Sequence, residues 1–265
     1  MDCLNNIYMN KEIDLSVSNY GTVRALHYDM AILPWGATEP HNLHLPYMTD
    51  CLLSQAVALD AAEMALTNYG VRAMVLPPVG MGAQNPGQRD LSFCIHYRLA
   101  TQAAILQDIV SSLHHQGLRK LLIVNGHGGN SFKGIIRDLA VDYPDFIILV
   151  ADWFAALPAK DWFDNPGDHA DELETSVMMH YHPELVNLDE AGPGQARPFA
   201  LKSLREKAAW LPRHWTLVTD DTGIGDPRLA TAEKGRRYAE AVAAKYALLL
   251  KELASVSSVE EMYSK

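Results

Sequence analysis

One stretch early in the sequence concentrates side chains that bind divalent metals. The segment Thr38–Asp50, TEPHNLHLPYMTD, holds Glu39, His41, His44 and Asp50, with two prolines stiffening the backbone between them. A polar loop can also carry such residues for solubility alone. This segment alone therefore does not distinguish a metal site from an ordinary loop, and the later motifs are needed.

Further ligand types follow in two later motifs. The turn NGHGGN surrounds His127 with glycines, which let a backbone bend tightly beside a ligand. His169 and Glu174 are five residues apart in HADELETS. On one helix they would face different ways, but both can reach one site if His169 lies in the loop before the helix. Acidic residues also suit a helix start, which accounts for Asp171 and extends to Glu172.

The five strongest candidates supply three carboxylates and two imidazoles: Glu39, His41, Asp50, His127 and Glu174. Mixed nitrogen and oxygen ligation without thiolate is typical of zinc or manganese, with iron also possible. Five ligands that include a shared carboxylate suit two ions. Two ions close together can share a hydroxide nucleophile and polarise a carbonyl, so this set predicts hydrolytic chemistry.

A nucleotide-binding oxidoreductase is the alternative from another class. Gly126 and Gly128 begin a GxGxxG pattern after an apolar run, but Ser131 stands where the third glycine belongs. No serine lies in a GxSxG context, which argues against a serine triad.

Apolar runs alternate with helical patterns along the chain. Strands are expected at 30–36, 71–76, 119–124 and 146–151, and helices at about 49–68, 97–116, 131–141 and 229–253, with another starting within 168–176. Thr49 or Asp50 is the expected cap of the first long helix. The alternation predicts a single α/β domain over residues 1–265, with three α/β/α layers and a mostly parallel central sheet. In such sheets the site lies beyond the carboxyl ends of the strands.

The bulk composition excludes several classes of partner. The formal net charge is −10, from 22 basic and 32 acidic residues, so neither nucleic acid nor an anionic membrane is an expected partner. No apolar run is long enough to span a membrane, and the early acidic residues do not fit a signal peptide. Three widely spaced cysteines, Cys3, Cys51 and Cys94, suit a reducing compartment. We therefore expect a cytoplasmic protein.

Four motifs in order resemble the creatininase (creatinine amidohydrolase) family. The first segment resembles its T-E-x-H-G-x-H-L-P-x-x-T-D signature, and NGHGGN and HADELETS resemble its second and third motifs. The segment Gly225–Gly235, GDPRLATAEKG, is similar to its C-terminal motif. The resemblance covers about 200 residues.

The resemblance implies a creatininase-like α/β/α fold, a dinuclear metal centre and hydrolysis of non-peptidic, often cyclic, amide C–N bonds. By position, it makes Glu39, His41, Asp50 and His127 metal ligands, with Asp50 bridging the ions. It makes His169 the proton shuttle.

Four positions and one loop depart from the family pattern. Asp171 replaces a glycine in the third motif, and the loop from Gly82 to Ser92 does not follow the usual pattern. Gly129 stands where creatininase proper has a glutamate, so Glu174 is expected to complete the ligand shell, with Glu172 as the alternative ligand. Asn42 replaces a glycine, and Gly128 lacks the aromatic side chain found beside the substrate in creatininase proper. The family also includes formamidopyrimidine deformylases and peptidases, so the substrate stays open among these classes.

A homo-oligomer is expected, and the resemblance implies a hexamer. The proline-bearing segment 183–212 and two tryptophans expected to be exposed, Trp210 and Trp215, also fit a subunit interface.

Overall fold

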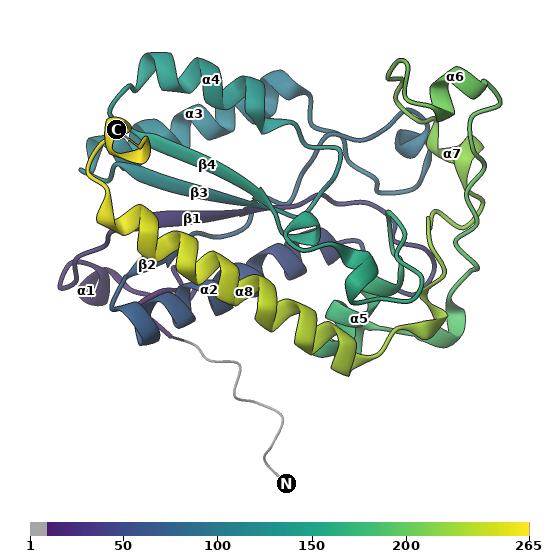
Figure 1. Ribbon diagram of the computed structural model, residues 1–265, viewed down its shortest axis with the longest axis horizontal. Coiled ribbons are helices and arrows are strands. Elements are labelled where there is room, and N and C mark those ends of the chain that lie inside the picture. The colour runs from purple at the N-terminus through teal and green to yellow at the C-terminus, as the bar shows by residue number, and fades with distance from the viewer. Residues whose placement is uncertain (1–9, 265) are drawn as a thin grey trace, which may run out of the picture.

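The computed structural model describes residues 10–264 and centres on one parallel sheet (Figure 1). Cys3 and the rest of residues 1–9 lie outside this description. Four strands pair in the order β2–β1–β3–β4, and every pairing is parallel. Their bounds are β1 Met30–Trp35, β2 Ala73–Val75, β3 Lys120–Asn125 and β4 Ile147–Asp152. All four predicted strands are present, although β2 is only half as long as predicted.

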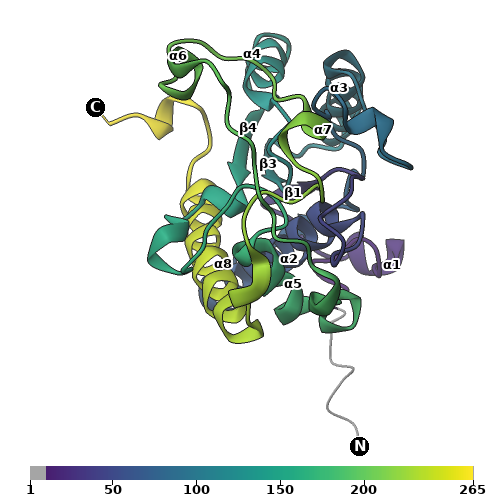
Figure 2. The same cartoon turned by 90° about the vertical axis from the view of Figure 1, so that its right-hand side faces the viewer.

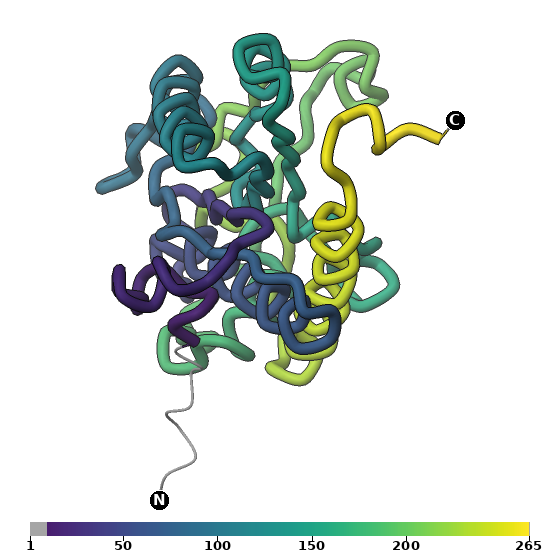
Figure 3. Tube along the Cα trace, turned by 90° about the vertical axis from the view of Figure 1, so that its left-hand side faces the viewer, coloured from purple at the N-terminus to yellow at the C-terminus, as the bar shows by residue number. Residues whose placement is uncertain are grey.

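Helices cover both faces of the sheet. One layer contains α2 (Thr49–Tyr69), α5 (Glu172–Tyr181) and α8 (Ala232–Ser255), and the other contains α3 (Leu99–His115) and α4 (Phe132–Asp142). Figures 2 and 3 show the same two layers from either end of the molecule. The fold is therefore the predicted three-layer α/β/α arrangement.

Side chains that alternate along the strands build two separate cores. Ile32 and Leu122 pack toward α2 and α8, whereas their neighbours Leu33 and Ile123 pack toward α3 and α4. Successive strand residues point to opposite faces, and both faces of a parallel sheet are covered. This is why these strands appear in the sequence as continuous apolar runs.

The start of α2 differs from the prediction. The residue at the N-cap is Met48, and no side chain caps the helix, although Thr49 or Asp50 was the expected cap. Asp50 instead lies in the first turn and directs its carboxylate at His41. The predicted end is confirmed, because Gly70 adopts the left-handed conformation (φ 69°) that glycine tolerates.

The chain changes direction between β1 and β3. After β1 it adds β2 on one side and then returns to add β3 on the other side of β1. The ends of these two strands are in register at Trp35 and Asn125, and Gly126 N–H donates to the Trp35 carbonyl over 2.8 Å. Ligands bind at such a switch point in open α/β sheets. The loop after β1 and the turn after β3 are the two segments that carry the first two motifs.

The C-terminal motif anchors the third motif. Thr231 caps α8 through its side chain. A Cβ on Gly235 would lie 1.9 Å from the Ser176 carbonyl oxygen, so only glycine allows α8 to lie this close to α5. Lys234, beside it, forms an ion pair with the fully buried carboxylate of Glu172.

The segment between α5 and α8 is mostly irregular and contains the short helices α6 (Lys202–Arg205) and α7 (Trp215–Val218). Trp210 is 84% exposed, as expected, but Trp215 is only 3% exposed, so that part of the prediction is wrong. The Trp215 ring packs against His169 and its Nε1 donates to the Thr222 carbonyl. Elsewhere, α1 (Tyr20–Val23) precedes the sheet. No described helix is long and apolar enough to cross a membrane.

Candidate metal centre

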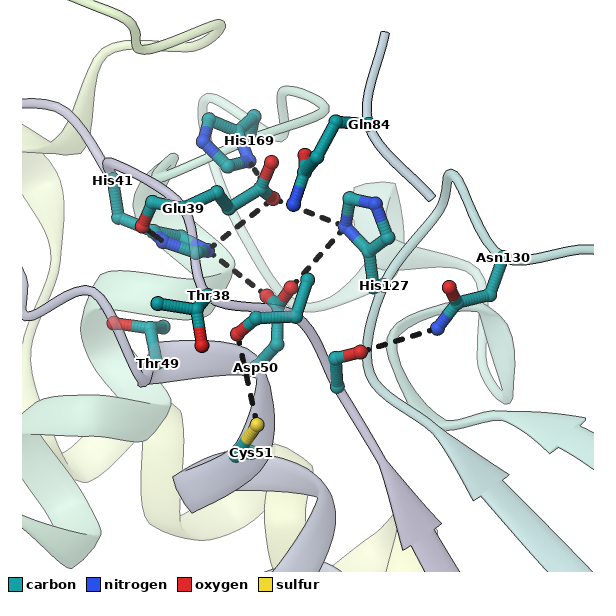
Figure 4. Close-up of polar contacts among 12 residues, drawn as sticks. Thr38, Glu39, His41, Thr49, Asp50, Cys51, Gln84, His127, Asn130 and His169 are labelled. Carbon is teal, nitrogen blue, oxygen red and sulfur yellow. Dashed lines mark hydrogen bonds and ion pairs between the residues drawn. The ribbon is translucent and has the colours of Figure 1, made fainter. Parts of the chain in front are cut away.

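Six side chains of ligand type converge beyond the ends of β1 and β3. Figure 4 labels five of them, all but Glu174. The six side chains form three overlapping groups, and within each group the candidate ligand atoms lie within 4.8 Å of one another. The groups are Glu39–His41–His169, Glu39–Asp50–His127 and His41–Asp50–Glu174. Every residue predicted from the sequence as a metal ligand or proton shuttle is in this cluster. All six side chains are buried.

The three imidazoles share one pattern of hydrogen bonds, in which one ring nitrogen (the outer) faces a backbone carbonyl and the other (the inner) faces the cluster. Each uses its outer nitrogen to donate to a backbone carbonyl: His41 Nδ1 to Glu39 (3.0 Å), His127 Nε2 to Ala83 (2.8 Å) and His169 Nε2 to Pro40 (2.8 Å). Each inner nitrogen faces carboxylate oxygen, at 2.9 Å from Asp50 for His41, and at 3.0 Å and 3.6 Å from Glu39 for His127 and His169. A neutral imidazole that donates outward presents a lone pair inward.

This arrangement fits a divalent cation. Lone pairs and carboxylates facing one another repel unless a cation or extra protons lie between them, and metal-binding histidines typically donate their other nitrogen to a carbonyl. Asp50 Oδ2 is buried and makes no directed hydrogen bond, although His127 Nδ1 lies 3.2 Å away. A metal ligand would satisfy this oxygen, so the residues present match the mixed nitrogen and oxygen ligation predicted from the sequence.

Without a metal, the cluster holds its charge in protonated histidines. Burial alone lowers the pKa of His41, but the carboxylates of Asp50, Glu174 and Glu39 together outweigh burial and raise that pKa to about 9. Burial also lowers the pKa of His127, but the carboxylates of Glu39 and Asp50 outweigh burial. The pKa of His127 is therefore well above its ordinary value. His169 differs, because burial and the neighbouring His41 lower its pKa. His169 is thus the imidazole of the three that is most readily neutral.

The two glutamates of the third motif have different partners. Glu174 lies with His41 and Asp50, and burial raises its pKa to about 8. Glu172 bonds Lys234 and the Asn165 N–H instead. The position of Glu174 therefore fits a metal ligand and that of Glu172 does not.

Asp171 caps α5 by accepting from Glu174 N–H (3.0 Å), as predicted. His44 stays outside the cluster, because its Nε2 lies 2.8 Å from Thr175 Oγ1.

Several supporting amides escaped the sequence analysis. Gln88 donates from Nε2 to Glu39 Oε2, and Asn125 donates to the His127 carbonyl (2.9 Å) and to Asp152 Oδ1 (2.8 Å). Asn130 accepts from Ala83 N–H (3.1 Å). NGHGGN offered a signal for the two asparagines, because amide side chains commonly bond the backbone within turns. Nothing local marked Gln88, which lies 49 residues from its partner.

The glycines of the turn are required by close packing. A Cβ on Gly126 would lie 2.4 Å from the Asp50 carbonyl oxygen. A Cβ on Gly129 would lie 2.1 Å from the Ala83 carbonyl oxygen and 2.4 Å from His127 Nε2. These close contacts explain why glycine is required at 126 and 129, two of the three glycines in the turn, without a nucleotide phosphate. They also explain why no side chain at position 129 contributes a ligand.

Two cavities meet at the cluster. The inner cavity, of about 110 Å³, extends from Glu39 and Asp50 toward Leu173 and Glu174. The outer cavity, of about 770 Å³, extends from Glu39 past Gln84 and Arg213 to Trp210. Glu39, His127 and His169 line both, so these candidate site residues lie where the smaller cavity adjoins the larger one.

The fold and cluster together define an α/β protein of the creatininase type. The family model Creatininase, described as creatinine amidohydrolase, matches residues 17–250. The chain therefore belongs to the creatininase family.

Relatives with assigned activities differ in their substrates. The mycofactocin precursor peptide peptidase of Mycobacterium ulcerans is 34% identical over 222 residues, which cover 80% of each chain. The creatinine amidohydrolase of Pseudomonas putida is 31% identical over 180 residues, which cover 60% of this chain and 66% of that protein.

Solved structures share the fold. A Bacteroides fragilis protein named "Putative creatinine amidohydrolase" is 63% identical, with a TM-score of 0.92 over 94% of this chain and 98% of its own. A creatininase mutant of Zn–Zn type has a TM-score of 0.73 at 24% identity, over 92% and 98% of the two chains. At that identity the likeness shows the common fold.

Proposed function

We propose that this protein is a metal-dependent amidohydrolase that holds two divalent ions, zinc or manganese, between Glu39, His41, Asp50, His127 and Glu174. The observation that carries the proposal is the shared orientation of the buried imidazoles, with outer nitrogens on carbonyls and inner nitrogens on carboxylates. Asp50 would be the ligand shared by both ions. Glu39, His41 and Asp50 each belong to two of the three ligand groups, and of these Asp50 has a carboxylate oxygen, Oδ2, without a directed hydrogen bond.

The ions would supply Lewis acidity, which lowers the pKa of a water molecule and polarises the amide carbonyl. Glu39 contributes one oxygen to this centre, because Gln88 occupies the other. Burial of the six side chains shields them from bulk water, which strengthens the charge interactions among them.

His169 is the proton carrier in this proposal. Its Nε2–H is fixed on the Pro40 carbonyl, so Nδ1, which faces Glu39 at 3.6 Å, is the atom that accepts a proton and passes it to the leaving nitrogen. Trp215 holds the ring from the side, with the ring centroids 5.2 Å apart and the planes at 89°. The lowered pKa keeps the imidazole neutral and ready to accept.

The bond class has two candidates. Resemblance to creatininases favours a non-peptidic, cyclic amide. A peptide amide is favoured by the outer cavity of about 770 Å³, which is in the roughly 300–1,000 Å³ range of pockets for drug-sized ligands, and by the 34% identity to a peptide peptidase.

The test compares Asp50→Ala with His169→Ala. In protein purified without chelator, elemental analysis should find zinc or manganese. Asp50→Ala should lose it, whereas His169→Ala should retain it while turnover of lactam, formamide and peptide substrates falls roughly 10²–10⁴-fold. Absence of bound metal from the unmodified protein would contradict the proposal. Recovery of full activity by His169→Ala in excess metal would make His169 a ligand instead.

A further inference from the structure

The outer cavity contains one permanently cationic side chain. Of its lining residues, all within the described chain, Arg213 alone is a lysine or arginine, whereas Glu39 and Asp168 are acidic. Arg213 Nη1 pairs with Asp168 Oδ2 at 2.5 Å. No described residue hydrogen-bonds to its Nε or Nη2, so this face of the guanidinium keeps donors for a ligand.

Arg213 is held in place by stacking. Its guanidinium carbon lies 5.0 Å from the centroid of the Trp215 ring, and that ring contacts His169 at 5.2 Å. Two successive contacts therefore connect the cation to the proton carrier. They place the Arg213 guanidinium carbon within about 10 Å of the centre of the His169 ring. A group bound at Arg213 would therefore lie near the imidazole that is proposed to serve the leaving nitrogen.

A second polar group in the same cavity lacks a partner. Gln84 is 9% exposed, and its Oε1 is buried without a hydrogen bond among the described residues. Figure 4 shows its amide end turned toward Glu39 and His127. Leaving a buried acceptor without a partner is unfavourable, and a ligand N–H would satisfy it.

The cavity also has an apolar wall. Phe199, Trp210, Leu211 and Trp215 line it together with Arg213. Trp210 is 84% exposed and Leu211 is 51% exposed, so this wall offers apolar surface for a ligand to cover.

We infer that Arg213 forms a subsite for the carboxylate of an amide substrate, on the side of the leaving amine. This inference deepens the proposed hydrolysis and depends on it for the direction of the substrate. His169 serves the leaving nitrogen, so the fragment between that nitrogen and Arg213 is the amine product. The amine product is thus an amino acid or short peptide with a free carboxylate and an apolar side chain. Gln84 Oε1 accepts a hydrogen bond from an N–H group of this fragment.

The probes are glycyl-phenylalanine and its C-terminal amide, titrated into the metal-loaded protein and followed by calorimetry. The free acid should bind roughly 10-fold or more tightly than the amide, because hydrogen bonds to charged groups contribute about 1.5–3 kcal/mol. Arg213→Gln should weaken the acid by this factor and change the amide by less than about twofold, while Arg213→Lys should retain part of the preference.

Arg228→Gln is the matched control. Arg228 is a surface arginine paired with Asp226 outside the cavity, and its replacement should leave both affinities unchanged. Equal affinities for acid and amide in the unmodified protein, an unchanged preference in Arg213→Gln, or no binding of either probe would each overturn the subsite. A carboxylate preference in a protein that hydrolyses no amide would instead retain the subsite and refute the proposed hydrolysis.

Discussion

Gln88 donates from its side-chain amide to Oε2 of Glu39, so only Oε1 of that carboxylate faces His41, His127 and His169. Gln88 is itself held, because its Oε1 accepts from the Asn85 N–H at 2.5 Å. The loop after β2 thereby selects which oxygen of Glu39 serves the centre.

Gln88→Leu is therefore expected to loosen the metal. Freed from Gln88, Glu39 can rotate, and loss of such a supporting partner typically costs 10–100-fold in metal affinity. Competition with a chelating dye measures this change. Gln107→Leu, on the exposed surface of α3, is the control and should not alter affinity. Equal affinity in Gln88→Leu and the unmodified protein would show that the hydrogen bond is incidental.

The metal-free protein should lose stability as the pH rises, because of Glu174. Burial raises its folded-state pKa to about 8, above the unfolded value near 4.5. The folded protein therefore keeps a proton that the unfolded chain releases, and stability falls between these two pH values.

Glu174→Gln removes this dependence. In chelator-treated protein, urea unfolding should show a stability advantage of Glu174→Gln over the unmodified protein that grows from pH 4.5 to about 8 and then stays constant. Glu252→Gln, at an exposed position of α8, should show no such trend. An advantage that is independent of pH would sink this explanation.

Lys234→Met should destabilise the fold by roughly 2–4 kcal/mol. It leaves the fully buried carboxylate of Glu172 without its ammonium partner, and the cost stays below that of a wholly buried pair because 26% of the lysine side chain reaches solvent. Asp164→Asn is the comparison, since Asp164 faces the same ammonium but is 69% exposed. That change should cost at most about 1 kcal/mol in urea unfolding. Equal losses in the two variants would contradict this ranking.

Two neighbouring glycines should respond differently to alanine. In Gly129→Ala the new methyl would lie 2.1 Å from the Ala83 carbonyl, the acceptor of the His127 hydrogen bond, and should cost about 1–3 kcal/mol. Gly128→Ala meets no atom within 4 Å and should stay within about 0.5 kcal/mol. Thermal unfolding compares the two directly, and similar melting temperatures would count against the packing argument.

The sequence by itself determined the layers of the fold and the residue types of the site. Strand and helix periodicities are local, so the runs at β1 and β3 and the pattern of α2 could be recognised without knowing what they contact. The spacing within TEPHNLHLPYMTD and the glycines around His127 likewise marked metal-ligand chemistry before any contact was known.

The tertiary structure decided how those residues are used. Asp50 turns away from capping α2 because His41 and His127 lie beside it, and Glu172 pairs with Lys234 of α8 instead of joining Glu174 in the cluster. Asp50 and His127, like Glu172 and Lys234, are distant in sequence. The first pair meets where the segments after β1 and β3 adjoin, and the second meets where α5 packs against α8. No local pattern encodes such a contact, because the energy of a buried charge depends on what surrounds it in space.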